Sequence, residues 1–209
     1  MPKIKFIDLF AGAGGLSEGF VRAGFTPVAH VEMNKDACDT LRTRTAFHWL
    51  KEEGRISEYY EYLKGTITRD ELWAKTPENL IKSVINTEIS EETLPKIFQQ
   101  IDAELGTKKV DLVIGGPPCQ AYSVAGRVRK DMTNDPRNHL YKHYVEFLKK
   151  YQPKMFVFEN VPGILSANNG NYLQLIFDAV REAGYELDKK VLNAKDFGVL
   201  QDRKRVIII

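Results

Sequence analysis

The chain has 209 residues, of which 43% are hydrophobic and 28% charged, with a formal net charge of +2 at pH 7. Such a composition is ordinary for a globular domain with a sizeable core, and no stretch approaches the roughly 20 apolar residues of a membrane span. Two cysteines cannot build a disulfide framework, and the N-terminus lacks a signal-peptide pattern, so we expect a cytosolic protein with no membrane partner.

The first part of the chain alternates between predicted strands and helices. KIKFIDLF is a short apolar run that stops at AGAGG, and LSEGFVRAGF has helical spacing that ends at Gly24. TPVAHVE predicts a second strand and MNKDACDTLRTR a second helix. This alternation is typical of a mostly parallel α/β sheet with helices on both faces.

The rest of the chain continues this pattern after a different segment. Residues 49–82 are rich in charge and tyrosine, so we expect a helical insertion at the rim of a single domain over 1–209. IKSVINTEIS contains a short third strand. The later predicted elements are the strand KVDLVIGG, the helix NHLYKHYVEFLKKYQ with Asp135 and Pro136 at its start, the strand PKMFVFEN, the helix NYLQLIFDAVREAG, and the strands YELDKKVLNA and RKRVIII.

The glycine-rich turn after the first strand predicts a cofactor site. Glycines at a helix N-terminus let a ligand approach free backbone amides. Gly12 and Gly14 fit the start of a dinucleotide fingerprint, but Ser17 stands at its last position. Glu32, at the end of the second strand, can hold the ribose hydroxyls of an adenosine. Together they favour an adenosine-bearing cofactor other than a dinucleotide, although a plain strand–helix turn is the simpler alternative.

Cys119 stands in GGPPCQAYS, directly after the strand KVDLVIGG. Two prolines restrict the backbone and two glycines leave open space, so the thiol is predicted at the carboxyl edge of the sheet, where α/β ligands bind. A thiolate there can act as a nucleophile. Cys38, within a predicted helix, is interpreted instead as a buried core thiol.

Two further segments place polar groups near the same edge. Glu159 ends the strand PKMFVFEN, and a buried carboxyl there can donate or accept at a heterocycle nitrogen, although a strand-end salt bridge is the alternative. In QDRKR, the residues Gln201, Arg203 and Arg205 alternate and are expected to share one strand face. Arginines directed into a cleft can hold a phosphate or a base carbonyl.

These motifs, in this order, resemble those of DNA (cytosine-5)-methyltransferases. FAGAGG is similar to the family's S-adenosylmethionine motif, GGPPCQAYS to its catalytic motif, ENV to its glutamate motif and QDRKR to its QxRxR motif. The resemblance covers nearly the whole chain except about 49–82. It implies a Rossmann-like methyltransferase fold and transfer of a methyl group from S-adenosylmethionine to C5 of cytosine in double-stranded DNA, with S-adenosylhomocysteine as product.

The resemblance also implies roles for individual residues. Cys119 would attack C6 of a cytosine flipped out of the duplex, Glu159 would contact N3, and Arg203 and Arg205 would lie near the base and the nucleophile. The implied cofactor residues are Phe10, Ala11, Gly12, Gly14, Gly15, Glu32, Met33, Glu88, Pro117 and Leu140. The implied DNA-binding residues are Gln120, Ser123, Arg127, Arg129 and Lys130, and the last three belong to a basic loop that can meet phosphates.

The chain departs from the family pattern at its end. The family continues beyond QxRxR with a target-recognition region and two further motifs, whereas this chain ends in the apolar run Val206 to Ile209. Because an exposed apolar strand is poorly tolerated, we expect a truncated chain, or else one subunit of a split enzyme. We expect it to be monomeric otherwise, and to act in a bacterial cytoplasm on the nucleoid.

Four rival interpretations stay open at this point. A tRNA methyltransferase is disfavoured by AYS after PPCQ, and a non-catalytic relative by the presence of Cys119, Glu159 and Arg203. A dinucleotide-dependent oxidoreductase is disfavoured by Ser17 and by the proline–cysteine run. A zinc site at His139 and His143, which share a helix face, lacks an evident third ligand, so no metal is expected.

Overall fold

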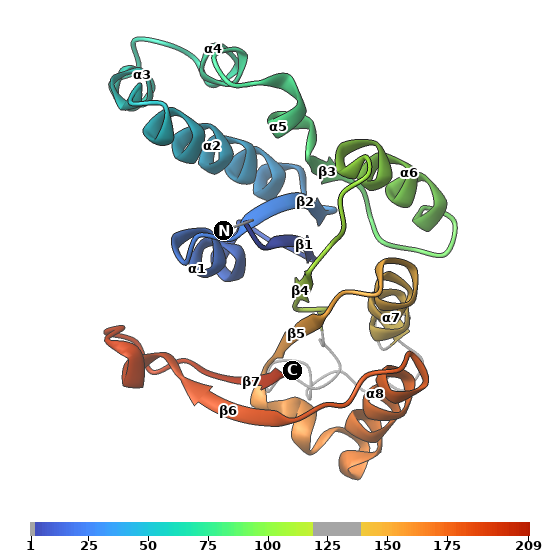
Figure 1. Ribbon diagram of the computed structural model, residues 1–209. Coiled ribbons are helices and arrows are strands. Elements are labelled where there is room, and N and C mark those ends of the chain that lie inside the picture. Colours follow the sequence, from blue (N-terminus) through green and yellow to red (C-terminus); the bar gives the residue numbers. More distant parts are fainter. Residues whose placement is uncertain (1–2, 119–138) are drawn as a thin grey trace.

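The computed structural model describes residues 3–118 and 139–209 of the chain (Figure 1). Within these residues, seven strands form one sheet in the order β3-β2-β1-β4-β5-β7-β6. The strands are β1 (Lys5–Leu9), β2 (Thr26–Glu32), β3 (Val84–Asn86), β4 (Leu112–Gly115), β5 (Met155–Asn160), β6 (Lys189–Asn193) and β7 (Lys204–Ile208).

Parallel pairing dominates this sheet. β1 pairs in parallel with both β2 and β4, and the parallel ladder continues to β3 on one side and to β5 on the other. β7 pairs antiparallel with β5 and with β6. The predicted α/β, Rossmann-like fold with a mostly parallel sheet is therefore confirmed.

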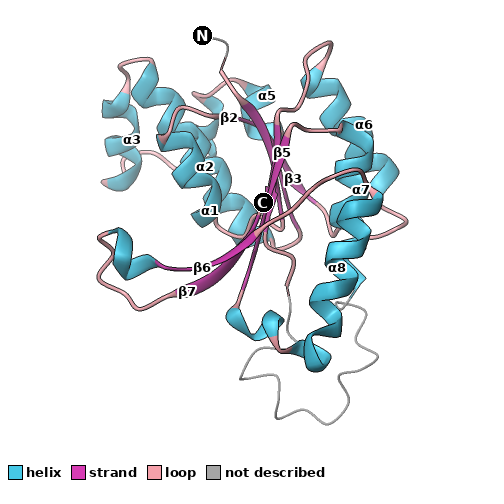
Figure 2. Cartoon of the chain, turned by 60° about the horizontal axis from the view of Figure 1, so that its bottom comes forward, coloured by secondary structure: helices cyan, strands magenta, loops and turns pink. Residues whose placement is uncertain are grey.

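Helices cover both faces of the sheet (Figure 2). α1 (Gly15–Arg22) and α2 (Lys35–Glu52) lie on one face, whereas α6 (Leu94–Leu105), α7 (Leu140–Tyr151) and α8 (Asn171–Glu182) lie on the other. Successive strand residues point to opposite faces, so each strand supplies both layers of the core. Phe6, Leu112, Ile114 and Val157 pack toward Leu16 and Phe20 of α1, and the larger cluster toward α6–α8 includes Ile7, Leu9, Val31, Val113, Phe156 and Phe158.

The segment after α2 adds three short helices outside it: α3 (Ile56–Leu63), α4 (Arg69–Ala74) and α5 (Glu78–Lys82) (Figure 1). Ala46 and Leu50 of α2 and Leu72 of α4 are fully buried and form a separate small core with surrounding aromatic side chains. Buried Asp39 of α2 pairs with Arg69 of α4 at 3.5 Å. The expected helices over about 49–82 are present, and the interpretation of this segment as an insertion stays a prediction.

Most predicted elements lie within a few residues of their observed bounds. TPVAHVE coincides with β2, and Gly24 follows the end of α1 with a φ of 89°. α2 is longer than predicted, because buried residues recur up to Leu50. α6 is missing from the sequence-based prediction, although Leu94, Ile97, Ile101 and Leu105 follow the helical period and are all buried. Three short 3₁₀ segments, η3 (Pro162–Leu165), η4 (Ala167–Gly170) and η5 (Ala194–Phe197), are also missing from it.

The final strand does not form an edge of the sheet. β7 lies between β5 and β6, and its Val206 and Ile208 side chains are fully buried. β7 is therefore not an exposed edge strand, and the expectation of a truncated chain stays a prediction. No helix in the described part of the chain is both long enough and apolar enough to cross a membrane.

Candidate active site

The carboxyl ends of β1 and β4 lie side by side at one edge of the sheet. Leu9, the last residue of β1, pairs with Gly115, the last residue of β4. β1 leads into α1 on one face, whereas β4 follows α6 on the other face (Figure 2). Such a switch point leaves a crevice at the strand ends in which ligands of open α/β sheets bind. The glycine loop and the segment that leads to Cys119 both start at this point.

Residues 10–14 form a tight turn between β1 and α1. Phe10, Gly12 and Gly14 have positive φ values of 54°, 54° and 82°. A Cβ added to Gly14 would lie 2.7 Å from Leu41 Cδ2, whereas no heavy atom lies within 4 Å of a Cβ added to Gly12 or Gly15. The turn is therefore packed on the α2 side and open at the other two glycines. Because the first amides of a helix lack intrahelical partners, the start of α1 at Gly15 adds free donors here.

Glu32, the last residue of β2, links this turn to the next one. Its Oε2 accepts a hydrogen bond from the Gly12 amide at 2.8 Å, and its Oε1 accepts one from the Asn34 amide at 2.8 Å. A carboxylate oxygen can accept two hydrogen bonds, so each oxygen can still accept from a hydroxyl group. Met33 is 65% exposed and offers an apolar surface beside this carboxylate.

Side chains from β3 and α2 hold the backbone of Glu32 and Met33. Asn86, the last residue of β3, donates from Nδ2 to the carbonyl oxygens of Glu32 at 3.1 Å and Met33 at 2.9 Å. Cys38 Sγ also donates to the Glu32 carbonyl, at 3.3 Å. Burial raises the pKa of the Cys38 thiol, which is a core thiol as predicted. Asn86 is not among the predicted site residues, because an exposed amide on a short strand gives no sequence signal.

Gly115, the last residue of β4, and Gly116, which follows it, permit close approach of neighbouring strands. A Cβ on Gly115 would lie 2.6 Å from the Leu9 carbonyl oxygen, and a Cβ on Gly116 would lie 2.8 Å from Glu159 Oε2. Pro117 is buried, and its carbonyl accepts a hydrogen bond from Asn160 Nδ2 at 3.0 Å. Asn160 thus ties the end of β5 to the segment that leads to Cys119. It is a second site residue that the sequence-based prediction omits.

Glu159 and Arg205 form an ion pair beside Gly116. Glu159 Oε1 lies 2.8 Å from Arg205 Nε, and each side chain is about one quarter exposed, at 25% and 24%. Arg205 also donates from Nη1 to the Lys204 carbonyl at 2.7 Å. Because Gly116 and Arg205 confine it, the Glu159 carboxylate has a defined position at the strand edge.

Of the predicted residues Gln201, Arg203 and Arg205, only Arg205 lies in a strand. β7 starts at Lys204, so Gln201 and Arg203 precede the strand, and the expected alternation of three residues on one strand face is wrong. The strand starts late because Asn193 Oδ1 accepts from the Arg203 amide at 3.1 Å and Asn193 Nδ2 donates to Asp202 at 2.8 Å, which closes the β6–β7 connection. Within the described residues, Arg205, and not Arg203, pairs with Glu159.

Some predicted site residues take no part in the contacts given above, and others lie outside the described residues. Glu88 is exposed after β3, and Leu140 is the first residue of α7. Cys119, Gln120, Ser123, Arg127, Arg129 and Lys130 lie outside the described residues, as do Asp135 and Pro136. Among the residues that the structure describes, no group of three or more His, Cys, Asp or Glu side chains could hold a metal ion.

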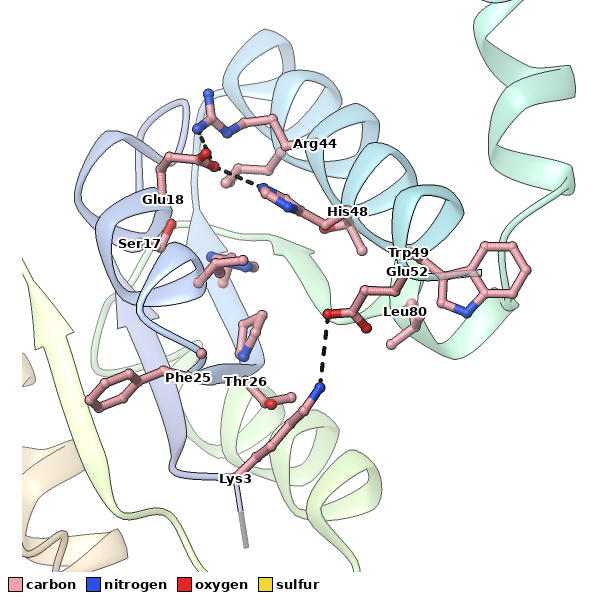
Figure 3. A pocket seen from close by; sticks show the side chains of 16 residues that line it. Lys3, Ser17, Glu18, Phe25, Thr26, Arg44, His48, Trp49, Glu52 and Leu80 are labelled. Carbon is pink, nitrogen blue, oxygen red and sulfur yellow. Dashed lines mark hydrogen bonds and ion pairs between the residues drawn. The ribbon is translucent and has the colours of Figure 1, made fainter. Parts of the chain in front are cut away.

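A separate cavity of about 150 Å³ lies between α1 and α2, over the start of β2 (Figure 3). Glu18 lies at one end, where it accepts from Arg44 at 2.6 Å and pairs with His48 at 2.9 Å. The Lys3–Glu52 ion pair, at 3.8 Å, lies at the other (Figure 3). This cavity is distinct from the strand-edge site, although Arg44 lines it and its Nε lies 3.5 Å from the Cβ position of Gly14.

Comparison with known proteins shows one clear similarity. The family profile described as C-5 cytosine-specific DNA methylase matches residues 4–209. The type II methyltransferase M.Bpa9945I of Bacillus paralicheniformis is 40% identical over 232 residues, which cover 97% of this chain and 52% of the relative. M1.HphI of Haemophilus parahaemolyticus is 36% identical over 99% of this chain and 45% of its own length. The chain thus spans about half the length of these relatives.

Other relatives extend this similarity. The type II methyltransferase M.AquIA of Picosynechococcus is 34% identical, and the match covers 98% of this chain and 71% of that protein. Among solved structures, a prophage-encoded Escherichia coli protein described as a DNA modification methyltransferase superposes with a TM-score of 0.63 at 26% identity, over 99% of this chain and 46% of that one. The S. pombe Dnmt2 methyltransferase, at 17% identity and a TM-score of 0.58, shares the fold over 99% of this chain and 50% of its own.

Proposed function

Because this chain belongs to the C-5 cytosine-specific DNA methylase family, we propose that the protein transfers a methyl group from S-adenosylmethionine to C5 of cytosine in DNA. The observation that carries the proposal is the Glu159–Arg205 pair beside Gly116, at the start of the segment that leads to Cys119. This pair lies at the same sheet edge as the glycine loop and Glu32, so the proposed base site and the proposed cofactor site would adjoin.

The described residues fit S-adenosylmethionine. The open space at Gly12 and Gly15, next to the free amides of α1, suits the methionine end of the cofactor. The Glu32 carboxylate retains acceptor capacity for the two ribose hydroxyls, and exposed Met33 can pack on adenine. We also assign Pro117, Glu88 and Leu140 to this proposed pocket, with Phe10, Ala11 and Gly14 in the turn. When bound, the cofactor supplies an electrophilic methyl group on a sulfonium sulfur.

In this proposal, Cys119 activates the base. Cytosine C5 is a poor nucleophile in the free ring. The thiolate of Cys119 forms a bond to C6, and the electron pair of the C5–C6 double bond moves to C5, which becomes nucleophilic. After methylation, the C5 proton leaves to water, the double bond forms again and the sulfur–C6 bond breaks. The thiolate is thereby restored.

Glu159 and the arginines assist this addition. Electron density that the thiolate adds to the ring spreads to N3 and the exocyclic oxygen, so a hydrogen bond at N3 stabilises the adduct. In this proposal, Glu159 carries a proton on Oε2 and donates it in the hydrogen bond to N3, while Arg205 contacts Oε1. Arg203 extends the positive charge at this edge.

The substrate in this proposal is double-stranded DNA with the target cytosine flipped out of the stack, because the reacting atoms are inaccessible within a duplex. Arg127, Arg129 and Lys130 would meet the phosphates, while Gln120 and Ser123 lie next to the nucleophile in sequence. The names of the relatives, type II methyltransferases, support DNA modification as the role of the protein.

The experiment is transfer of labelled methyl groups from S-adenosylmethionine by the intact protein. Mixed genomic DNA and tRNA are the two substrates, and Cys119→Ser is the variant. We expect label in DNA with the wild type and a loss of at least a thousandfold with the serine variant. Transfer to tRNA instead of DNA would show that the substrate is wrong. Full activity of the serine variant would show that the thiol mechanism is wrong.

A further inference from the structure

Asn86 makes contacts that the proposed chemistry does not use. Its Nδ2 carries two hydrogens, and both are engaged, with the Glu32 carbonyl at 3.1 Å and the Met33 carbonyl at 2.9 Å. A single side chain from β3 therefore holds two successive carbonyl groups of the turn between β2 and α2. These are the residues that the proposed function assigns to ribose and adenine.

The two carbonyl groups differ in the other hydrogen bonds that they accept. The Glu32 carbonyl also accepts from the Thr87 amide at 3.0 Å and from Cys38 Sγ at 3.3 Å. For the Met33 carbonyl, we find no second donor among the described residues. Met33 lies between the last residue of β2 and Asn34, the N-cap of α2, so neither a strand nor a helix fixes its peptide. Asn86 supplies the missing restraint.

The direction of the Glu32 side chain depends on this restraint. Its carboxylate reaches the Gly12 amide on one side and the Asn34 amide on the other, both at 2.8 Å. Asn34 is two residues from Glu32, so rotation of the intervening Met33 peptide would pull the Asn34 amide away from Oε1. The same rotation would turn the exposed Met33 side chain.

α2 in turn anchors β3. Arg42 of α2 donates from Nη2 to the Val84 carbonyl at 3.2 Å and pairs with Asp39 at 3.0 Å. Asp39 in turn pairs with Arg69 of α4 at 3.5 Å. The position of Asn86 is therefore supported by α2 and by the helical segment beyond it.

We propose that Asn86 is a positioning residue for the cofactor, which holds the Glu32–Met33 backbone so that the carboxylate meets the ribose and the Met33 side chain meets the adenine. This inference rests on the proposed function. Asn86 touches neither the transferred methyl group nor the base, so its removal weakens binding of the nucleoside half and leaves the chemical step unchanged.

The test compares three variants of the intact protein. Asn86→Asp removes both donors and sets a carboxylate against two carbonyl oxygens, and Asn86→Ala removes the donors alone. Asn79→Asp makes the same charge change at an exposed position of α5 and serves as the control. We expect the Kd for S-adenosylhomocysteine to rise about tenfold or more in Asn86→Asp and several-fold in Asn86→Ala, with no change in Asn79→Asp.

Two readouts separate positioning from general damage. The KM for S-adenosylmethionine should rise by the same factor as the Kd, with kcat within about twofold of the wild type. Binding of 5′-methylthioadenosine, which shares only the nucleoside half, should weaken equally. If Asn86→Asp does not fold, Asn86→Ala carries the test.

The outcomes are distinguishable from those of the proposed function. If the wild type binds S-adenosylhomocysteine and both Asn86 variants bind it equally well, the positioning role is wrong while the proposed function stands. A fall in kcat without a rise in KM would also overturn the positioning role. If the wild type does not bind S-adenosylhomocysteine at all, the proposed function itself fails.

Discussion

At the scale of single residues, the candidate site depends on close contacts between backbone and side chains as much as on reactive groups. The Glu159 carboxylate can lie where it does because Gly116 has no side chain, and Asn160 fixes the Pro117 carbonyl one residue further on. Neither Gly116 nor Asn160 reacts in the proposed mechanism. Their effect is to set the distance between the proposed base-binding carboxyl and the segment that leads to the nucleophile.

Gly116→Ala should therefore impair function more than folding. The new Cβ would lie 2.8 Å from Glu159 Oε2, which cannot move freely because Arg205 holds the other oxygen at 2.8 Å. We expect kcat/KM for methyl transfer to fall at least about tenfold, with a loss of about 1–2 kcal/mol in the free energy of unfolding.

Gly19→Ala is the matched control. Gly19 lies within α1, and no heavy atom lies within 4 Å of its added Cβ, so alanine should leave activity unchanged and raise stability by up to about 1 kcal/mol. Steady-state kinetics and urea unfolding on both variants provide the check. Equal activity of the two alanine variants would contradict the role given to Gly116.

At the scale of elements, α2 connects the sheet to the outer helices. Asp39 is 4% exposed and pairs with Lys35 at 2.9 Å, Arg42 at 3.0 Å and Arg69 at 3.5 Å. The hydrogen bond from Lys35, opposed by burial and aided by the charges of Arg69 and Arg42, lowers the pKa of Asp39 below its ordinary value of 3.8. One carboxylate thus joins α2, α4 and, through Arg42, β3.

Asp39→Asn should destabilise the protein in a pH-dependent way. Because the folded-state pKa is lowered, the ionised group contributes stability above about pH 3.8, and this contribution is lost as the pH falls through the lower folded value. We expect a loss of about 1–3 kcal/mol in the free energy of unfolding at pH 7, and a smaller difference from wild type near pH 3.

Urea unfolding at both pH values measures this effect. Asp36→Asn, an exposed change in the first turn of the same helix, is the control and should cost less than about 0.5 kcal/mol. A pH-independent loss in Asp39→Asn would mean that the ion pairs do not cause it.

At the scale of the whole molecule, the proposed cofactor site joins strands from the middle of the sheet. The glycine loop follows β1, Glu32 ends β2 and Pro117 follows β4, so one ligand would contact segments that are more than 100 residues apart in sequence. A ligand that binds only this assembled edge should stabilise the entire fold.

S-adenosylhomocysteine at a hundred times its Kd should therefore stabilise the protein by about 2.7 kcal/mol. For a domain of this size, that corresponds to a rise of roughly 5–10 °C in Tm, measurable by thermal unfolding. NAD at equal concentration is the control and should produce no shift. A shift with NAD alone would favour the rejected dinucleotide-dependent interpretation.

Much of the fold could be predicted from the sequence, because buried parallel strands are continuous apolar runs and glycines mark their ends. β4 is an example, and Gly24 and Gly184 follow α1 and α8 with positive φ. α6 was equally predictable, since its apolar residues recur at the helical period. The extra length of α2 and the start of β7 depend on tertiary packing and on the Asn193 hydrogen bonds.

The sequence by itself determined the family and the α/β class and predicted the reactive groups, because motif order, apolar period and side-chain chemistry are local properties of the chain. Only the tertiary structure decided which of these groups meet. It paired Arg205 rather than Arg203 with Glu159, set Gly116 against that carboxylate and brought Asn86 behind Glu32 from 54 positions away. These contacts follow from strand order and register, and each arises between segments distant in sequence, where no local pattern records the partner.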